Sequence, residues 1–333
     1  EQPPEEPTPV GAFRFNTDTS RLEYYDGSQW VDVISDSPLY HTGGVRGLFF
    51  GGRTPSDVDT IDYINISTTG NAIDFGNRLA AARQAGGTAS RSRGVAVGRS
   101  GGNDTIEFVT IASTGNAQDF GNSTASRGGS PMAVSDGVRG IFAGGDPGTI
   151  TNLIDYITIA QTGNAVDFGD LIIAQSDGGR VQSPTRGIIA GGRTPPSSTK
   201  TNVIEFITMA STGNGADFGD LIQGRNEIAA DSNAVRGIFA GGNDGGAVPR
   251  IEYVTIATLG NSIDFGDIAT ASTESRGSAS PTRFAFAHGV ESGYVDNISF
   301  VEISTTGNSV HFGTLTQARG QAAGFSNGHG GLG

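Results

Sequence analysis

One phrase returns six times along this chain. Copies of IASTGNAQDFG, the form found at 111–121, also stand at 66–76, 159–169, 209–219, 256–266 and 303–313, where the last has His-Phe-Gly instead of Asp-Phe-Gly. The turn glycines of these copies, Gly70, Gly115, Gly163, Gly213, Gly260 and Gly307, are 45, 48, 50, 47 and 47 residues apart. This interval indicates a repeat protein, in which each unit buries its apolar surface against its neighbours.

Each repeat contains two apolar runs that are typical of strands. The first begins with Arg, as in VRGIFAGG at 138–145, and the second is β-branched and aromatic, as in IEFVTIA at 106–112. In the second run Ile106 and Phe108 point to one face, and Val109 and Ile111 point to the other. Because both faces are apolar, we expect sheets that are covered on both sides by other sheets.

The remaining parts of a repeat predict two more strands. Gly and Asn of the Thr-Gly-Asn phrase suit the positive φ angles of a tight hairpin turn, and Asp-Phe-Gly then lies on the outgoing strand. A segment such as 221–234 returns to the next Arg-Gly run. Four strands at intervals of 45 to 50 residues predict an all-β fold, a six-bladed β-propeller over 37–333.

Two segments could complete the first blade. LTQARGQAAGFSNG at 315–328 resembles the returning segment of other repeats but has no Arg-Gly run after it. The alternative is 37–43, because SPLYHTGGVRG at 37–47 aligns with SPMAVSDGVRG at 130–140. We favour closure of the ring by the C-terminal strand.

The glycine pair after the second strand and the acidic-aromatic pair in the third resemble kelch repeats over 45–328. Kelch units usually carry Trp in the outer strand, whereas phenylalanine stands in the comparable region here, so the resemblance implies a kelch-like propeller. The phenylalanines in question are Phe75, Phe120, Phe168, Phe218, Phe265 and Phe312.

The repeated charged residues are interpreted as structural. Asp-Phe-Gly holds magnesium in kinases, but a strand lysine, a phosphate loop and a catalytic base are not recognisable here. We expect the phenylalanine to fill the space between blades and the aspartate to bond local backbone or the repeated arginine. In blades one to five we also expect a partly buried ion pair within the repeat. The arginines are Arg46, Arg93, Arg139, Arg186 and Arg236, with Arg283 in the sixth blade, and the acids are Asp62, Glu107, Asp155, Glu205 and Glu252.

Composition argues against several classes of function. The formal net charge is -13 and Lys200 is the single lysine, which disfavours nucleic acid as a partner. The chain has no cysteine and four scattered histidines, so we expect no metal or other cofactor. No apolar run approaches a membrane span, and membrane insertion is not expected. We predict that the protein is not an enzyme.

Variation among the repeats is concentrated in one loop. The loop between the second and third strands varies from 6 to 11 residues, whereas the distance from the third strand to the turn glycine is constant at nine positions. These loops share one rim with the connections between blades, opposite the Thr-Gly-Asn turns, and we predict that this variable rim binds a glycan or a protein. The loops would also vary in this way if no function constrained their sequences. The candidate binding residues are Arg53, Asp146, Arg193, Lys200, Asn243, Asp244 and Tyr294.

The front of the chain carries a second signal. Residues 1–10 are Pro- and Glu-rich and predict a linker, whereas GAFRFNTDTSRLEYYDGSQWVDV at 11–33 alternates apolar and polar residues around turn signals and predicts two or three short strands. We assign 11–36 as an attachment or oligomerisation segment, because so small a sheet is not stable alone.

This front phrase resembles a β motif of tail-fibre and other virion proteins of tailed bacteriophages, and the repeats resemble structural proteins of phages that infect marine bacteria. The resemblance implies a virion protein, a tail fibre or appendage. It would contact other virion proteins through the front segment, form a homo-oligomer, a trimer if it is a fibre, and adhere to the host surface. The alternatives are a cellular kelch-like adaptor or lectin, and a polysaccharide-cleaving propeller with close carboxylates on the variable rim.

Overall fold

The structure is a computed structural model that describes residues 8–17, 21–32, 45–196 and 198–332. The chain forms two compact units, Glu1–Thr42 and Gly43–Gly333. Much of the predicted linker at 1–10, the end of the predicted attachment segment at 33–36, and the alternative closing segment at 37–43 lie outside the described residues.

The first unit contains the short strands expected from the front phrase. They are β1 (Phe13–Asn16), β2 (Arg21–Tyr25) and β3 (Trp30–Asp32), which form an antiparallel sheet in the order β1-β2-β3. Phe13 lies opposite Tyr24 and Phe15 opposite Leu22, so these four side chains share one face, and all four are exposed. The opposite face carries both polar and aromatic side chains: Arg14 bonds Glu23 at 2.7 Å and lies over the ring of Trp30, which also contacts Tyr25.

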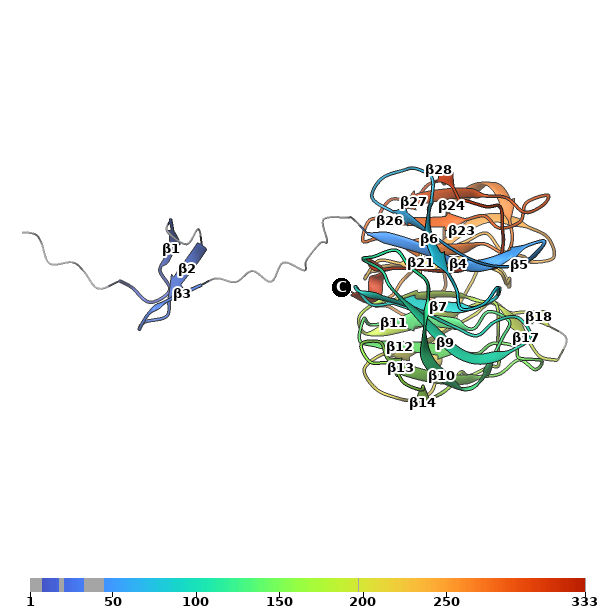
Figure 1. Ribbon diagram of the computed structural model, residues 1–333, viewed down its shortest axis with the longest axis horizontal. Helices are drawn as coiled ribbons and strands as arrows, with labels where there is room; N and C mark the ends of the chain where they lie inside the picture. Colours follow the sequence, from blue (N-terminus) through green and yellow to red (C-terminus); the bar gives the residue numbers. More distant parts are fainter. Residues whose placement is uncertain (1–7, 18–20, 33–44, 197, 333) are drawn as a thin grey trace, which may run out of the picture. The chain divides into compact units, whose positions relative to one another are not determined.

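The described part of the second unit contains six four-stranded antiparallel sheets, here numbered I to VI (Figure 1). Sheet I consists of β29 (Ala323–Ser326), β4 (Arg46–Thr54), β5 (Ser56–Asn65) and β6 (Ile73–Asn77). Sheet II consists of β7 (Gly86–Ala89), β8 (Arg93–Val97), β9 (Asn103–Thr110) and β10 (Gln118–Arg127). Sheet III consists of β11 (Met132–Ser135), β12 (Arg139–Ala143), β13 (Leu153–Thr158) and β14 (Val166–Asp170).

Sheet IV consists of β15 (Gly179–Gln182), β16 (Arg186–Ala190), β19 (Val203–Thr208) and β20 (Ala216–Asp220). Sheet V consists of β21 (Ala229–Ser232), β22 (Arg236–Ala240), β23 (Val248–Thr255) and β24 (Ile263–Ser272). Sheet VI consists of β25 (Arg276–Ala279), β26 (Arg283–Ala287), β27 (Asn297–Glu302) and β28 (Val310–Thr314). A small hairpin, β17 (Arg193–Thr194) and β18 (Thr199–Lys200), and one 3-10 helix, η1 (Gly330–Leu332), complete the described elements. The predicted all-β fold is confirmed.

Sheet I combines the two ends of the second unit. Its first strand, β29, pairs antiparallel with β4, and Ala323 lies opposite Phe50 while Ser326 lies opposite Gly47. The position beside β4 is the one for which the sequence offered 315–328 and 37–43. In the structure β29, which belongs to 315–328, occupies that position.

Apolar side chains fill the spaces between the sheets. Six buried clusters are present among the described residues, each shared by two sheets, and the cluster that follows the last repeat joins sheet VI to sheet I. Sheet II illustrates the arrangement: Val109 and Ile111 pack against sheet I, whereas Ile106 and Phe108 pack against sheet III. The predicted burial of both faces is confirmed.

The Thr-Gly-Asn phrase holds neighbouring sheets together. Between sheets I and II, Gly115 N donates to Phe75 O at 2.8 Å, Ala117 N donates to Asn77 O at 2.8 Å, and Asn116 Oδ1 accepts the Asn77 N–H at 3.0 Å. The same three bonds recur at every junction, including that from sheet VI to sheet I, where Gly70 N donates to Phe312 O at 3.0 Å. We expected a tight hairpin turn with positive φ at both Gly and Asn. The connection is longer than a tight turn, because residues 66–72 separate β5 from β6. Gly70 has φ of 153°, but the asparagines do not have positive φ, and their side chains serve as acceptors instead.

Asp-Phe-Gly completes this junction. Phe75 is 2 % exposed and meets the ring of Tyr63 edge-on, with 5.9 Å between the ring centroids, and the other five copies repeat this contact. A Cβ on Gly76 would lie 2.5 Å from the carbonyl oxygen of Gly115, so a side chain cannot fit there. Asp74 and its equivalents are exposed, and their carboxylates make no hydrogen bond within the described residues. The predicted bonding of these aspartates is therefore wrong.

The predicted pairing of the repeated arginines is also wrong. Arg46 lies 4.8 Å from the centroid of the Tyr63 ring, and its Nη1 donates to the carbonyl oxygen of Ile111 in the next sheet. The other five arginines make equivalent contacts, and Arg283 additionally pairs with Glu302 on its own sheet. The register explains the difference, because Arg46 lies opposite Asn65 at one end of the sheet, three positions along β5 from Asp62.

Other arginines pair with the buried acids, across the spaces between sheets. Asp62 bonds Arg319 at 3.0 Å and Glu252 bonds Arg225 at 2.6 Å, and all four side chains are fully buried. Glu107 bonds Arg78 and Asp155 bonds Arg127 in the same way. Glu205 has no arginine and instead accepts the backbone N–H groups of Ile172 and Ile173; burial raises its pKa. In sheet VI, Ser299 stands at the position of the acid, and Ser272 stands at the position that corresponds to Arg225 and Arg319.

We predict that Gly313→Ala weakens the junction between sheets VI and I. Gly313 is not among the residues with positive φ, but its Cβ would overlap the carbonyl oxygen of Gly70, and this overlap should cost about 1–3 kcal/mol of unfolding free energy. Chemical denaturation measures the effect. Gly293→Ala is the control, because no atom lies within 4 Å of its Cβ position. Equal stability of the two variants would contradict the assigned contact.

We also predict that Arg225→Met lowers the unfolding free energy by about 3–5 kcal/mol, because Glu252 would remain as a buried, unpaired charge. Arg250→Met is the matched control. Arg250 approaches the same carboxylate at 3.9 Å but is 31% exposed, and its removal should cost less than about 1 kcal/mol. Similar losses for the two variants would show that Glu252 does not depend on Arg225.

Candidate functional site

The variable loops are held beside the segments that precede the first strands. Arg53 of the first loop exchanges backbone hydrogen bonds with Gly320, at 2.9 and 3.1 Å. Three later loops make the same kind of bridge through the pairs Ser176 with Arg193, Asn226 with Asn243, and Thr273 with Val290. The loops and these segments therefore lie at the same edge of the sheets, which we call the variable rim.

Six equivalent residues at this rim have an uncommon backbone conformation. They are Gln84, Ser130, Asp177, Glu227, Glu274 and Gln321, and their φ angles lie between 54° and 61°. Backbone bonds connect them: the N–H of Asp177 donates to Ser130 O at 3.1 Å, and the N–H of Glu227 donates to Asp177 O at 2.8 Å. Non-glycine residues in the left-handed region cost about 1–3 kcal/mol each. The recurrence of this conformation brings one side chain from each repeat to the same place; we call these six the rim residues.

Three of the rim residues are acidic, and arginines lie between them. Asp177 bonds Arg193 at 3.0 Å and Arg276 at 3.4 Å, and Arg276 also donates to Ser130 Oγ at 2.7 Å. Glu274 Oε1 accepts a bond from Gln321 Nε2 at 3.0 Å. Burial raises the pKa of Glu227, and the neighbouring charge of Asp177 adds to this effect. Burial likewise raises the pKa of Glu274, with the charge of Glu227 as the next cause.

The space below the rim residues is nearly filled. A cavity of about 20 Å³ is lined by residues from, or directly before, the first strands of all six sheets. This volume suffices for about one water molecule. Arg180 lies across it and donates to Gly87 O at 3.1 Å and to Ala230 O at 3.3 Å, and burial lowers its pKa to about 10. A ligand at this rim would therefore bind on the surface and would not enter a channel.

Five of the seven residues predicted from the sequence gather around the acidic rim residues. Arg193 bonds Asp177, and Lys200 Nζ bonds Asn243 Oδ1 at 2.8 Å. The charge of Arg53 acts on Glu274 and on Tyr294, whose pKa is raised by burial first and then by Glu274.

The other two predicted residues, Asp146 and Asp244, are placed differently. Asp146 Oδ1 accepts the Gly148 N–H of its own turn at 3.1 Å. Asp244 makes no side-chain bond within the described residues, although its charge acts on Arg225. The rim residues were not predicted from the sequence, because the repeats were compared by the length of the loop between the second and third strands. Aligning the returning segments would have placed Gln84, Ser130, Asp177 and their equivalents in one column.

No group of three or more His, Asp or Glu side chains is arranged to hold a metal ion in the part of the chain that the structure describes. In the same part, no helix is long and apolar enough to span a membrane. No protein-family model and no curated protein sequence matches this chain.

We predict that Glu227→Gln stabilises the protein at pH 8. The folded-state pKa of Glu227 is raised, so its ionised form is disfavoured in the fold, and this penalty is present above the folded pKa and disappears below the unfolded value near 4.5. The stabilisation relative to the natural chain should therefore shrink as pH falls toward 4. Denaturation at both pH values measures it, and Asp119→Asn controls for loss of one negative charge. A gain that persists unchanged at pH 4 would contradict the assignment.

Proposed function

We propose that the second unit is a six-bladed, kelch-like β-propeller. Six four-stranded sheets, the pairing of β29 with β4, and an apolar cluster at each junction from sheet I to sheet VI and back to sheet I support this arrangement. The small cavity lined from all six sheets is consistent with a central axis. An experimental map that resolves six sheets around one axis would test the proposal, and an open stack would refute it.

On this scaffold we infer a binding protein and not an enzyme. The observation that carries the inference is the gathering of Arg53, Arg193, Lys200, Asn243 and Tyr294 at the rim where the loops vary, while the junction phrase is constant. Cations, amides and a phenol at one rim suit the hydroxyls and carboxylates of a glycan, or a polar protein surface. Several of these side chains are already held in place without a ligand: Arg53 donates to the carbonyl oxygen of Pro55, and Arg193 pairs with the carboxylate of Asp177.

We further propose that the protein belongs to the virion of a tailed bacteriophage, as a tail fibre or appendage. The support is the resemblance of the front phrase and of the repeats to phage structural proteins. The first unit agrees with this role, because its sheet exposes Phe13 at 67% and Phe15 at 61% on one apolar face. A face of this kind requires a partner. We assign it to other virion proteins and to copies of the same chain, as a trimer in a fibre.

A second candidate is a propeller that cleaves a polysaccharide. The observation that favours it is the proximity of Asp177, Glu227 and Glu274, which is the pattern of close carboxylates expected for glycoside hydrolysis. Against it, Asp177 is bonded by two arginines, and the cavity beneath has room for only about one water molecule. Release of reducing ends from host polysaccharide by the purified protein, and its loss in Glu274→Gln, would favour the enzyme.

The binding proposal predicts the outcome of an adsorption experiment. Purified protein should be detected in virions and should compete with those particles for adsorption to the bacterium on which they are grown. The triple variant Arg53→Gln, Arg193→Gln, Lys200→Gln should compete about tenfold less well, which corresponds to loss of about 1.4 kcal/mol of binding free energy. Asp119→Asn combined with Asp217→Asn is the control, because these exposed residues lie on outer strands. Absence from virions would refute the virion role, and full competition by the triple variant would refute the rim.

A further inference from the structure

The rim opposite the variable loops carries six arginines in equivalent positions. Arg46 begins β4 and lies opposite Asn65, which ends β5 just before the Thr-Gly-Asn turn. Its equivalents begin the second strand of every other sheet and are also half-buried. They are Arg93, Arg139, Arg186, Arg236 and Arg283. The repeat thus places one guanidinium group beside each Thr-Gly-Asn turn.

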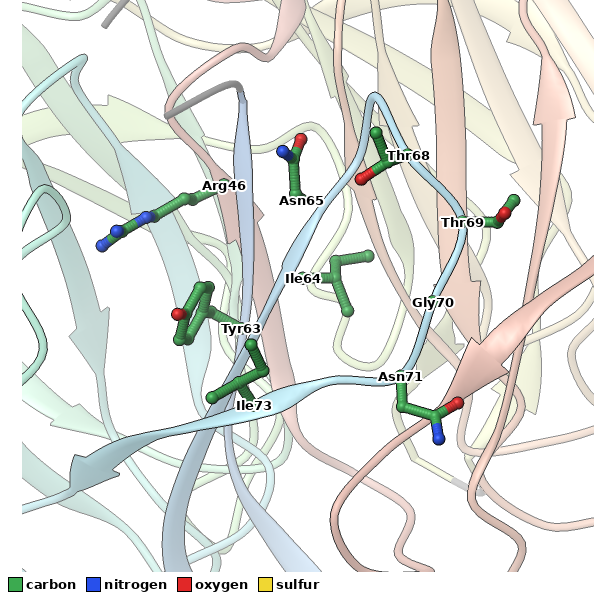
Figure 2. Close-up of a pocket in the computed structure, with 9 residues that line it drawn as sticks. All are labelled: Arg46, Tyr63, Ile64, Asn65, Thr68, Thr69, Gly70, Asn71 and Ile73. Atoms are coloured by element: carbon green, nitrogen blue, oxygen red, sulfur yellow. The ribbon is translucent and has the colours of Figure 1, made fainter. Parts of the chain in front are cut away.

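Each of these groups is held in a fixed orientation. The Arg46 guanidinium lies on the face of Tyr63, and both side chains are drawn in Figure 2. Its Nη1 is anchored to Ile111 O at 2.7 Å. The anchor and the ring contact together fix the plane of the group. Arg236 is held in the same way by Tyr253, at 4.3 Å, and by Ile303 O. A planar fork that is already ordered loses little entropy when it forms further hydrogen bonds.

Five of the arginines retain donors that the described residues do not use. Within 45–196 and 198–332, Nε and Nη2 of Arg46, Arg93, Arg139, Arg186 and Arg236 have neither a hydrogen-bond acceptor nor a carboxylate. None of these atoms is among the buried polar atoms that lack a partner, so they are accessible to solvent. Arg283 differs, because its Nε bonds Glu302 at 2.8 Å. Adjacent N–H groups of this kind match the two oxygens of a carboxylate, sulfate or phosphate.

A hollow lies next to the first of these arginines. It has a volume of about 360 Å³ and is lined by Arg46, Tyr63 and the turn that contains Thr68 and Thr69 (Figure 2). Hollows of about 200 and 220 Å³ lie beside the equivalent turns of the second and third sheets. Ligand pockets typically span about 300–1,000 Å³, so the first can receive a group the size of a sugar ring. Hydroxyls beside a guanidinium provide partners for both the hydroxyls and the acidic group of such a sugar.

We propose that this arginine rim binds an acidic polysaccharide, with anionic groups along the polysaccharide bound by several of the arginines. A chain of negative charges would contact several equivalent sites at once, and avidity would compensate for weak binding at each. The aromatic rings beside the arginines disfavour nucleic acid, because Tyr63 is covered on a face by Arg46 and met edge-on by Phe75, which leaves little room for a stacked base. The net charge of -13 makes a localised cationic rim necessary for any polyanion to bind.

Dextran sulfate and unmodified dextran of the same length provide the first test, by biolayer interferometry on the full chain. We expect dextran sulfate to bind at low salt and to weaken as salt is raised, and dextran not to bind. Alginate tests carboxylates in place of sulfates. Equal responses to dextran sulfate and dextran would overturn the proposal, as would tighter binding of single-stranded DNA at matched charge.

Variants locate the binding on the molecule. A triple variant should weaken dextran sulfate binding by about tenfold or more, because three of the repeated contacts are lost. It combines Arg46→Gln, Arg139→Gln and Arg236→Gln. The matched control is Arg53→Gln, Arg193→Gln, Lys200→Gln, which removes the same charge from the variable rim and should change binding by less than about threefold. Equal losses would show non-specific attraction and overturn the proposal. Since the two triple variants are on opposite rims, failure here is distinguishable from failure of the adsorption experiment.

A gain-of-binding variant keeps the test decisive if the triple variant does not fold. Glu302→Gln removes the carboxylate that occupies Arg283, and Glu302 is 49% exposed, so folding should be unaffected. We expect tighter binding of dextran sulfate by this variant. Asp119→Asn removes one exposed negative charge from an outer strand and is its control. The same affinity for both variants would overturn the role of the arginines.

Discussion

The second unit depends on one interaction, the hydrogen bonds between each Thr-Gly-Asn turn and the outer strand of the preceding sheet. An outer strand presents unpaired N–H and C=O groups, which invite association with other chains. Here Gly115 and Ala117 occupy two of the carbonyl groups of β6, and Asn116 occupies an N–H group. The junction therefore joins the repeats and protects their edges with the same atoms. This double role explains why the phrase is the most constant part of the repeat.

Buried ion pairs add a second connection between sheets, with a different physical character. The carboxylate of Asp62 and the guanidinium of Arg319 are both removed from water, which costs several kcal/mol for each ion, and their attraction offsets this cost only when the geometry is good. Such a pair therefore contributes little net stability but strongly penalises a sheet that docks without its partner. The chain itself supports this account. Where Ser299 replaces the acid, Ser272 replaces the arginine, so no unpaired charge is left inside.

Periodicity made the strands, the four-stranded units, the buried phenylalanines and the two-sided core predictable from the sequence. Partners could not be predicted in the same way, because a repeat contains more than one arginine and spacing alone does not say which faces an acid. Arg46 and Asp62 are close in sequence, yet Arg319, which follows 257 residues after Asp62, makes the bond. Register decides this: Asp62 points toward sheet VI, whereas Arg46 reaches toward sheet II. An alignment of the repeats places the rim residues in one column, but their left-handed conformation could not be predicted, because Gln, Ser, Asp and Glu do not require it.

Repeats of this kind must also depart from symmetry, and the departures indicate where function can reside. At the second position of the first strands, five repeats have Gly87, Ala133, Ala230, Gly277 or Gly324, and the remaining one has Arg180. Six large side chains could not converge on one small space, so one arginine fills it and bonds the carbonyl groups of Gly87, Ala230 and Gly324. The variable loops depart from symmetry without such a packing reason, because they face solvent. The arginine rim does the opposite and keeps its donors nearly uniform. Loops that differ suit a single irregular ligand, whereas five equivalent arginines with donors left free by the described residues suit a ligand that is itself a repeat.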